Sequence, residues 1–233
     1  MCTVTYIPQT DGFILTSNRD EKKYRPTLPP RIYTEKAAKL VYPKDEKAGG
    51  TWIAANENGT CIVLLNGAFE NHQKKQSYRK SRGAILLEAI EKENPIGYFN
   101  EINLFDIEPF TLIIAQNNHL IELKWDERNK HIIEHSPLET HIWSSATLYN
   151  QEQRNLRKHW FEDFVQKNNI LDEEKIHDFH ANTQPENTDY GLVINRDDTL
   201  KTVSISQLVF RNNKIKMTYM DKINNTPIKE ILL

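Results

Sequence analysis

The chain has 233 residues and a formal charge of −2 at pH 7, with 27% charged and 38% hydrophobic residues. This length suits one large domain or two small ones and is enough to bury a sizeable core. The composition excludes a disordered protein, and the near-zero charge gives no electrostatic reason to expect nucleic acid as a partner. No run of apolar residues approaches the roughly eighteen that a transmembrane helix needs.

The first residues, the cysteine content and the missing nucleotide-binding motifs exclude further classes of protein. Because the first residues lack a basic stretch followed by an apolar one, we expect no secretory signal and a cytoplasmic protein. The two cysteines, Cys2 and Cys61, cannot build a disulfide framework, and no C-x-x-C pair indicates structural zinc. No phosphate-binding loop or Gly-rich dinucleotide fingerprint occurs, so we predict no nucleotide cofactor. We also expect no other cofactor and no metal.

The first 65 residues are predicted to form β structure. Runs of β-branched and aromatic residues, separated by turn residues, indicate two hairpins, with strands over 3–7 and 13–17 and over 51–55 and 60–65. The polar stretch between these hairpins is predicted to be an extended loop because it contains Pro26, Pro29 and Pro30.

Helices and strands then follow in blocks. Helical spacing of apolar residues predicts helices over 81–93, with Ser81 at the capping position, and over 95–103, 151–167 and 172–180. Strands are predicted over 110–115, 119–125, 130–135, 200–206, 207–211 and 214–220. Because the elements do not alternate one by one, the order predicts an α+β fold with antiparallel sheets, in one domain over residues 1–233.

Position 2 is the sharpest candidate for chemistry. Methionine aminopeptidases remove Met1 when the next residue is small, so the mature protein would begin with Cys2. Its thiol, with a pKa of about 8.5, and its α-amine, with a pKa of about 7.7–8.0, would then form a nucleophile with its own base. A cysteine at this position can also be incidental, and a retained Met1 would block the amine.

A charged segment, Ser17–Glu21, ends the first predicted hairpin. If this hairpin closes, the segment returns beside Cys2. Arg19 would there favour the thiolate, and Asp20 or Glu21 could hold the α-amine or orient Arg19. The alternative is a solvated charge pair beside a turn.

These residues resemble a known family. Met-Cys-Thr at the start, Ser-Asn-Arg-Asp-Glu at 17–21 and Arg-Pro at 25–26 resemble the NRDE-domain family, also called the transport-and-Golgi-organisation family. Residues 48–53 resemble the Gly-Gly-Thr-Trp strand entry of that family, and Leu-Leu-Asn follows at 64–66. The resemblance spans most of the chain in order, and the N-terminal quarter is specific.

A later segment shows both a match and two departures. Residues 142–148, with Arg154 downstream, resemble the family's Leu-Ser-Asn-x-x-Leu segment, but Ser145 stands where the family commonly has Asn. The family's Tyr-Gly-Thr-Arg region is Tyr-Gly-Leu-Val at 190–193, so a late basic residue is missing there. Arg154 or Lys201 could substitute for it.

The resemblance implies a fold and an activity. The NRDE family is similar to N-terminal-nucleophile hydrolases, nearest the choloylglycine hydrolase and penicillin V acylase group, which have a four-layer αββα sandwich and cleave a non-peptide amide in a small molecule. It implies Cys2 as nucleophile, Arg19 and Asp20 as its electrostatic attendants, with Glu21 as the alternative acid. It also implies Asn66 as an oxyanion-hole donor. Possible supporting residues are Asn18, Ser145 and Arg154.

A second function on the same fold stays open: a non-catalytic binding or trafficking protein for haem, acyl-CoA or a lipid-linked ligand. Eukaryotic members of the family resemble this class more. The serine at position 145 and the missing late motif favour it, because a binding protein can lose oxyanion donors without penalty. Either way the expected partner is a small molecule, and the sequence gives no oligomeric state.

Two weaker features have alternative interpretations. The basic residues of 74–82 form either a solvated loop or, beside a pocket, a surface that steers an anionic substrate. His177 and His180 lie three apart on a predicted helix and could face a metal. No third ligand is evident, and a surface histidine beside an acid is the commoner arrangement.

Overall fold

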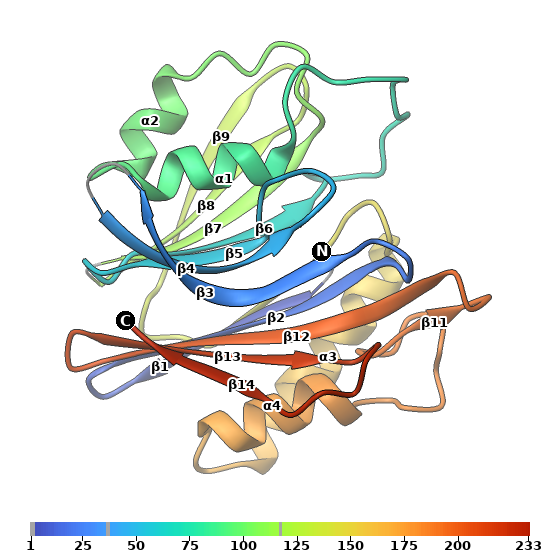
Figure 1. The fold of residues 1–233 in the computed structure, drawn as a ribbon. Helices are drawn as coiled ribbons and strands as arrows, with labels where there is room; N and C mark the ends of the chain where they lie inside the picture. The colour runs from blue at the N-terminus through green and yellow to red at the C-terminus, as the bar shows by residue number, and fades with distance from the viewer. Residues whose placement is uncertain (1–2, 36–37, 117) are drawn as a thin grey trace.

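The computed structural model describes residues 3–35, 38–116 and 118–233, and these form two antiparallel sheets (Figure 1). The first sheet has the order β10-β1-β2-β12-β13-β14, with β11 beside β12. Its strands are β1 (Thr3–Gln9), β2 (Gly12–Lys22), β10 (His141–Ser144), β11 (Asn195–Arg196), β12 (Leu200–Arg211), β13 (Lys214–Asp221) and β14 (Lys229–Leu232). The second sheet runs in chain order, with strands β3 (Thr27–Glu35), β4 (Ala38–Asp45), β5 (Ile53–Asn56), β6 (Cys61–Asn66), β7 (Phe110–Gln116), β8 (His119–Trp125) and β9 (Lys130–His135).

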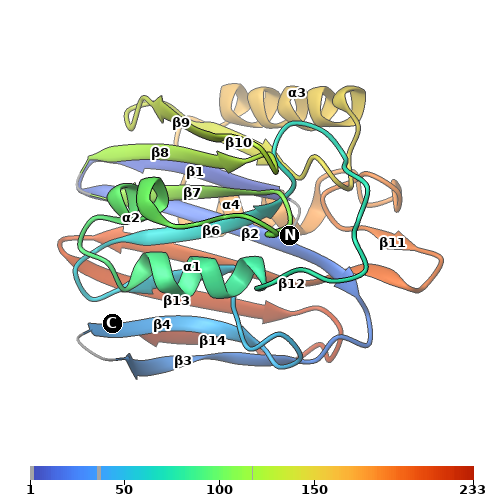
Figure 2. The ribbon, with the colours of Figure 1, turned by 90° about the horizontal axis from the view of Figure 1, so that it is seen from above.

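Helices cover the outer face of each sheet. α1 (Arg82–Ile90) and α2 (Pro95–Glu101) lie over the second sheet, as Figure 2 shows from above. α3 (Gln151–Lys167) and α4 (Glu173–Asn182) lie against the first sheet, on the other side of the molecule. The described residues therefore form an α+β fold of four layers, αββα, which confirms the predicted class.

Three hydrophobic cores hold these layers together. The core between the sheets includes Leu15, Val63 and Leu208, a second lies between the second sheet and α1 with α2, and a third lies under α3 and α4. Full burial of each large apolar side chain contributes about 1.5–3 kcal/mol. Successive side chains of β2 and β6 point to opposite faces of the sheet. Each strand therefore contributes apolar residues both to the core between the sheets and to the core under the helices that cover its own sheet.

The predicted loop around the prolines is wrong, because residues 27–35 form the strand β3. Pro29 and Pro30 fall where the pairing of β3 with β4 shifts register, between Leu28 and Arg31. β3 is also the edge strand of its sheet. Proline is tolerated at bulges and edges because no ladder hydrogen bond is lost there. At this place in the sheet, the two prolines therefore do not prevent a strand.

Two strand boundaries also differ from the prediction. Residues 200–211 form one continuous strand, β12, where the sequence indicated two, because polar residues such as Ser206 are buried inside it. β2 continues to Lys22 and does not stop at Ser17. The other helices and strands predicted above are confirmed, with Ser81 as the predicted N-cap and Asp172 as the N-cap of α4. β4, β10, β11 and β14 were not anticipated, and β4 lies in the stretch that was predicted to be a loop.

No helix among the residues described is both long and apolar enough to cross a lipid bilayer.

His180 joins α4 to the first sheet and is buried, so its prediction as a surface residue is wrong. Its Nδ1 donates to the Asn18 side-chain oxygen at 2.6 Å, and its Nε2 accepts from the Thr5 hydroxyl at 2.7 Å. The Asn18 amide nitrogen in turn donates to the carbonyls of His180 and Leu192. These bonds fix a neutral ring in one tautomer.

Burial lowers the pKa of His180 from 6.5 to about 3. As pH falls below about 6.5, the unfolded histidine takes up a proton that the folded one refuses, so the free energy of unfolding decreases. We predict that His180 contributes a loss of about 1.4 kcal/mol per pH unit between pH 6 and pH 4, measured by urea unfolding. His180→Gln should remove this component, and the exposed His119→Gln should keep it. An unchanged slope in His180→Gln would contradict the assignment.

Candidate functional site

The charged segment of β2 presents alternate side chains to opposite faces of its sheet. Asn18 bonds to His180 of α4, on the helix side. Arg19 reaches Asp45 at the end of β4, in the other sheet. β2 pairs with both β1 and β12, so Asn18, Arg19 and Asp20 are each at most 2% exposed. The segment is therefore an interior strand and not a solvated turn.

Arg19 is held by three contacts on the side facing the second sheet. Its Nη2 is 2.6 Å from Asp45 Oδ2, it donates to the Thr27 hydroxyl, and its guanidinium carbon lies 4.3 Å from the centre of the Trp52 ring. Burial lowers the pKa of Arg19, and the charge of Asp45 opposes that change. Because Arg19 is a buried cation with a fixed geometry, it can act as a preorganised charge.

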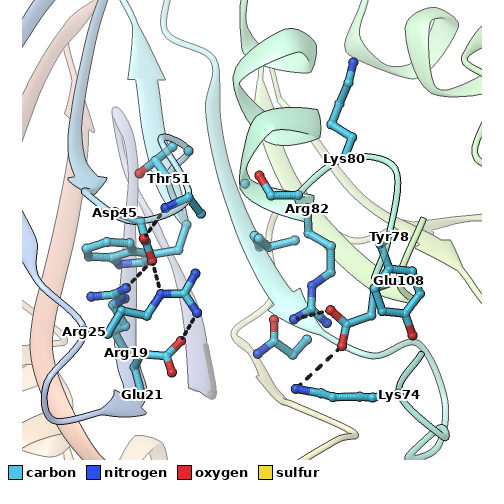
Figure 3. Close-up of a pocket in the computed structure, with 17 residues that line it drawn as sticks. Arg19, Glu21, Arg25, Asp45, Thr51, Lys74, Tyr78, Lys80, Arg82 and Glu108 are labelled. Atoms are coloured by element: carbon cyan, nitrogen blue, oxygen red, sulfur yellow. Dashed lines mark hydrogen bonds and ion pairs between the residues drawn. The ribbon is translucent and has the colours of Figure 1, made fainter. Parts of the chain in front are cut away.

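Asp45 also binds a second arginine. Arg25 Nε lies 2.6 Å from the same Oδ2 atom, and Arg25 Nη1 lies 3.1 Å from Glu21 Oε2. Burial would raise the pKa of Glu21, but the backbone N–H of Lys22 and the charge of Arg25 hold it below its ordinary value. Figure 3 shows the resulting chain of charges, Arg19–Asp45–Arg25–Glu21, along one side of a cavity.

Asp20 has a different environment from Glu21. Its Oδ2 accepts a hydrogen bond from the Tyr149 hydroxyl at 2.8 Å, and its Oδ1 accepts one from the Thr202 hydroxyl at 2.5 Å. It is 2% exposed. Asp20 is therefore the carboxylate held by hydroxyl groups, whereas Glu21 pairs with a cation.

Asn66 is the last residue of β6, and its position is fixed from two sides. The buried Ser145 hydroxyl donates to the Asn66 carbonyl at 2.8 Å. Gly67 follows with φ +80°, a left-handed conformation that favours glycine. The structure thus gives Ser145 a supporting contact to Asn66, which a sequence comparison alone could not show.

The cavity in front of these residues has a volume of about 320 Å³. Arg19, Arg25 and Asn66 line it, together with the first turn of α1. The turn approaches closely because Gly50 and Gly83 face each other; a Cβ on Gly50 would lie 2.5 Å from the Gly83 carbonyl carbon. The facing glycines therefore bring the N-terminus of a helix to the wall of the cavity.

The opposite wall of the cavity is also charged, as Figure 3 shows. Arg82 Nη2 lies 3.1 Å from Glu108 Oε2, and Lys74 and His72 approach the other Glu108 oxygen at 3.8 and 3.2 Å. The sequence left the basic run of 74–82 open between a loop and a pocket surface. The structure places Lys74 and Arg82 at the cavity.

Some predicted site residues lie elsewhere. Arg154 bonds to the Phe69 carbonyl and the Gln151 side chain and lines a different hollow. Lys201 forms an ion pair with Asp198 and lies opposite Glu21 in the pairing of β12 with β2.

Sequence reasoning missed a second buried arginine. Arg157 of α3 is fully buried, stacks 3.5 Å from the centre of the Tyr149 ring and donates to the Tyr190 and Gly191 carbonyls and to the Thr3 hydroxyl. Its position on a polar helix gave no signal of burial. Arg157 connects α3 to the start of β1.

Cys2 lies outside the described residues. β1 begins at Thr3, which is opposite Asn18 of β2 and Ser144 of β10. Arg19 and Ser145 directly follow those two partners. The chain therefore enters this sheet at the end where the charged cavity lies.

Solved structures of hydrolases have a similar arrangement of layers. A Caenorhabditis elegans N-acylethanolamine-hydrolyzing acid amidase ortholog matches with a TM-score of 0.61 at 11% identity, over 89% of this chain and 92% of that one. Two variants of the conjugated bile acid hydrolase from Clostridium perfringens match at 10% identity. The cysteine-to-alanine variant has a TM-score of 0.57, over 99% of this chain and 96% of that one, and the arginine-to-leucine variant has 0.62, over 99% and 92%. The fold is therefore that of N-terminal-nucleophile hydrolases.

The sequence itself matches one family. The model of the family described as Transport and Golgi organisation 2 covers residues 1–221. The chain belongs to this family, for which the NRDE name is a synonym. No curated protein sequence matches the chain.

We predict that Asp45→Asn destabilises the fold by about 3–5 kcal/mol, because it removes the charge that compensates the buried Arg19. Urea unfolding measures this change. Asp11→Asn is the matched control: its pair with Arg211 is exposed, so we expect less than about 0.5 kcal/mol. Equal effects of the two substitutions would show that the Asp45 pair does not stabilise the site.

Proposed function

We propose that the protein is a cysteine-dependent N-terminal-nucleophile hydrolase that cleaves an amide C–N bond in a small molecule. In this proposal Met1 is removed and Cys2 supplies both the nucleophilic sulfur and the general base. The observation that supports it most is the entry of β1 beside a cavity lined by Arg19 and Asn66. The shared fold with an acid amidase and a bile acid hydrolase supports the reaction class.

The proposed reaction has two halves. The Cys2 α-amine takes the thiol proton, and the sulfur attacks the amide carbonyl to form a tetrahedral intermediate. Collapse breaks the C–N bond, the leaving amine takes the proton, and a thioester remains. The Cys2 α-amine then takes a proton from water, which attacks the thioester. The C–S bond breaks, the acid leaves, and the proton returns from the α-amine to sulfur to restore the thiol.

Each neighbouring group has a proposed role. Arg19 is close to the start of β1 and would favour the thiolate over the thiol. Asn66 would donate to the oxyanion, in a position that Ser145 secures through its hydrogen bond to the Asn66 carbonyl. Asp20 or Glu21 would hold the α-ammonium group that forms when the Cys2 amine has taken the thiol proton.

Intact-mass analysis tests whether the nucleophile is assembled. We expect loss of Met1 and rapid single alkylation by iodoacetamide at pH 7.5, mapped to Cys2. Cys61 provides an internal control, because it is buried in the core between the sheets and burial raises the pKa of its thiol well above the ordinary value. Cys61→Ala should therefore keep the reaction and Cys2→Ala should abolish it.

The activity itself is tested with a panel of linear amides and lactams. We expect that Cys2→Ala lowers kcat by at least about a thousandfold on any substrate that the protein cleaves, as loss of a nucleophile does in other enzymes. A retained Met1, or hydrolysis that Cys2→Ala leaves unchanged, would contradict the proposal.

One observation favours a second function, the binding of haem, acyl-CoA or a lipid-linked ligand without catalysis. Five lysines and arginines line the cavity, and carboxylates or phosphates of such ligands would suit them. This function would be favoured over hydrolysis if the native protein and the Cys2→Ala variant bound the ligand saturably and with equal affinity, and if Cys2 were unreactive in the native protein.

A further inference from the structure

A second hollow adjoins the cavity, and several charged residues line both. This hollow has a volume of about 680 Å³. The residues that line both spaces are Glu21, Arg25, Asn66, Lys74 and Arg82. The junction of the two hollows therefore has three cations and one amide against one carboxylate.

The charge around the junction is opposite in sign to that of the chain. Among the described residues, seven lysines and arginines line the two hollows, against four aspartates and glutamates. The whole chain has a formal charge of −2. A concave surface with an excess of cations raises the local concentration of anions.

Two of the three cations at the junction, Arg25 and Arg82, are fixed in place. Arg25 is held by Asp45 and Glu21 on one wall, and Arg82 is held by Glu108 on the other. Burial lowers the pKa of Arg82, and the charges of Glu21 and Arg25 act on it across the cavity. Figure 3 shows Arg25 and Arg82 on facing walls, with Lys74 below Arg82. An anion between the walls would meet cations from both sides.

One further feature of the cavity suits an anion. The first turn of α1 lines it, and the N–H groups of a helix N-terminus favour negative charge.

We infer that Arg25, Lys74 and Arg82 form a subsite for an anionic group, a carboxylate or a phosphate, of the molecule on which the protein acts. The inference deepens the proposed function and rests on it for the identity of that molecule. Asn66 lies at the same junction, so the anionic group and the amide to be cleaved would occupy adjoining parts of one ligand.

Alkylation selectivity tests the subsite with Cys2 as the reporter. Iodoacetate and iodoacetamide react with the same thiolate, but only iodoacetate carries a charge. We expect the ratio of their rate constants to exceed that of the peptide Cys-Thr-Val-Thr by about fivefold or more, and to approach the peptide value in 0.5 M NaCl, where charges are screened.

Variants locate the effect. Arg82→Gln should return the ratio towards the peptide value, and Lys74→Gln, at a 69% exposed side chain, is a second variant that leaves the fold intact. Lys158→Gln, equally exposed on α3, should leave it unchanged. A ratio equal to that of the peptide, or one that Arg82→Gln and Lys74→Gln do not alter, would overturn the subsite.

Calorimetric titration separates this inference from the proposed function, because it does not need a reactive cysteine. With the Cys2→Ala protein, inorganic phosphate and succinate are titrated separately, and the tighter of the two identifies the class of anion. Arg82→Gln should weaken binding by about tenfold, the loss expected for one charge-assisted contact. Saturable, Arg82-dependent binding with an inert Cys2 would support the subsite and contradict hydrolysis. A reactive Cys2 in the native protein, with no anion binding to the variant, would contradict the subsite and support the proposed hydrolysis.

Discussion

The ion pair between Arg19 and Asp45 is the contact on which the rest of the site depends. It joins β2 of one sheet to the end of β4 in the other, at 2.6 Å and with the arginine side chain 3% exposed. Because a buried cation without a partner is costly, the two sheets must meet in the register that brings these residues together. The same carboxylate orients Arg25, so one aspartate fixes both cations on this wall of the cavity.

The two faces of β2 have different surroundings. Asn18 and Asp20 bond to His180, Tyr149 and Thr202, which secure the helices and β12. Arg19 and Glu21 belong to the cavity. The charged motif is thus part of a strand, in which neighbouring side chains point to opposite faces of the sheet and so make different contacts.

Most helices and strands, and the α+β class, could be predicted from the sequence because apolar periodicity reports burial directly, whereas the order of the four layers came from the family resemblance. The prediction of strands failed where the place of a residue in the sheet outweighs its intrinsic preference, as for Pro29 and Pro30 on an edge strand and Ser206 inside β12. The extent of one domain over the whole chain stays a prediction.

The candidate site was only partly accessible from the sequence. The roles given to Cys2, Arg19, Asp20 and Asn66 came from motif resemblance. Asp45 and Glu108 carried no motif, and their role follows from distant strands that meet in space. The burial of Arg157 likewise depends on carbonyl partners some thirty residues away. Long-range pairing of this kind leaves no local pattern to detect.

The central claim is that an arginine held by Asp45 activates an N-terminal cysteine, and the pH dependence of Cys2 alkylation tests it most directly. The rate of reaction with iodoacetamide between pH 5 and pH 10 gives the apparent pKa of the thiol in the native protein and in Arg19→Gln. The account predicts a value clearly below the ordinary pKa of about 8.5, and a rise towards 8.5 in the variant. An apparent pKa of about 8.5 in both proteins would contradict it.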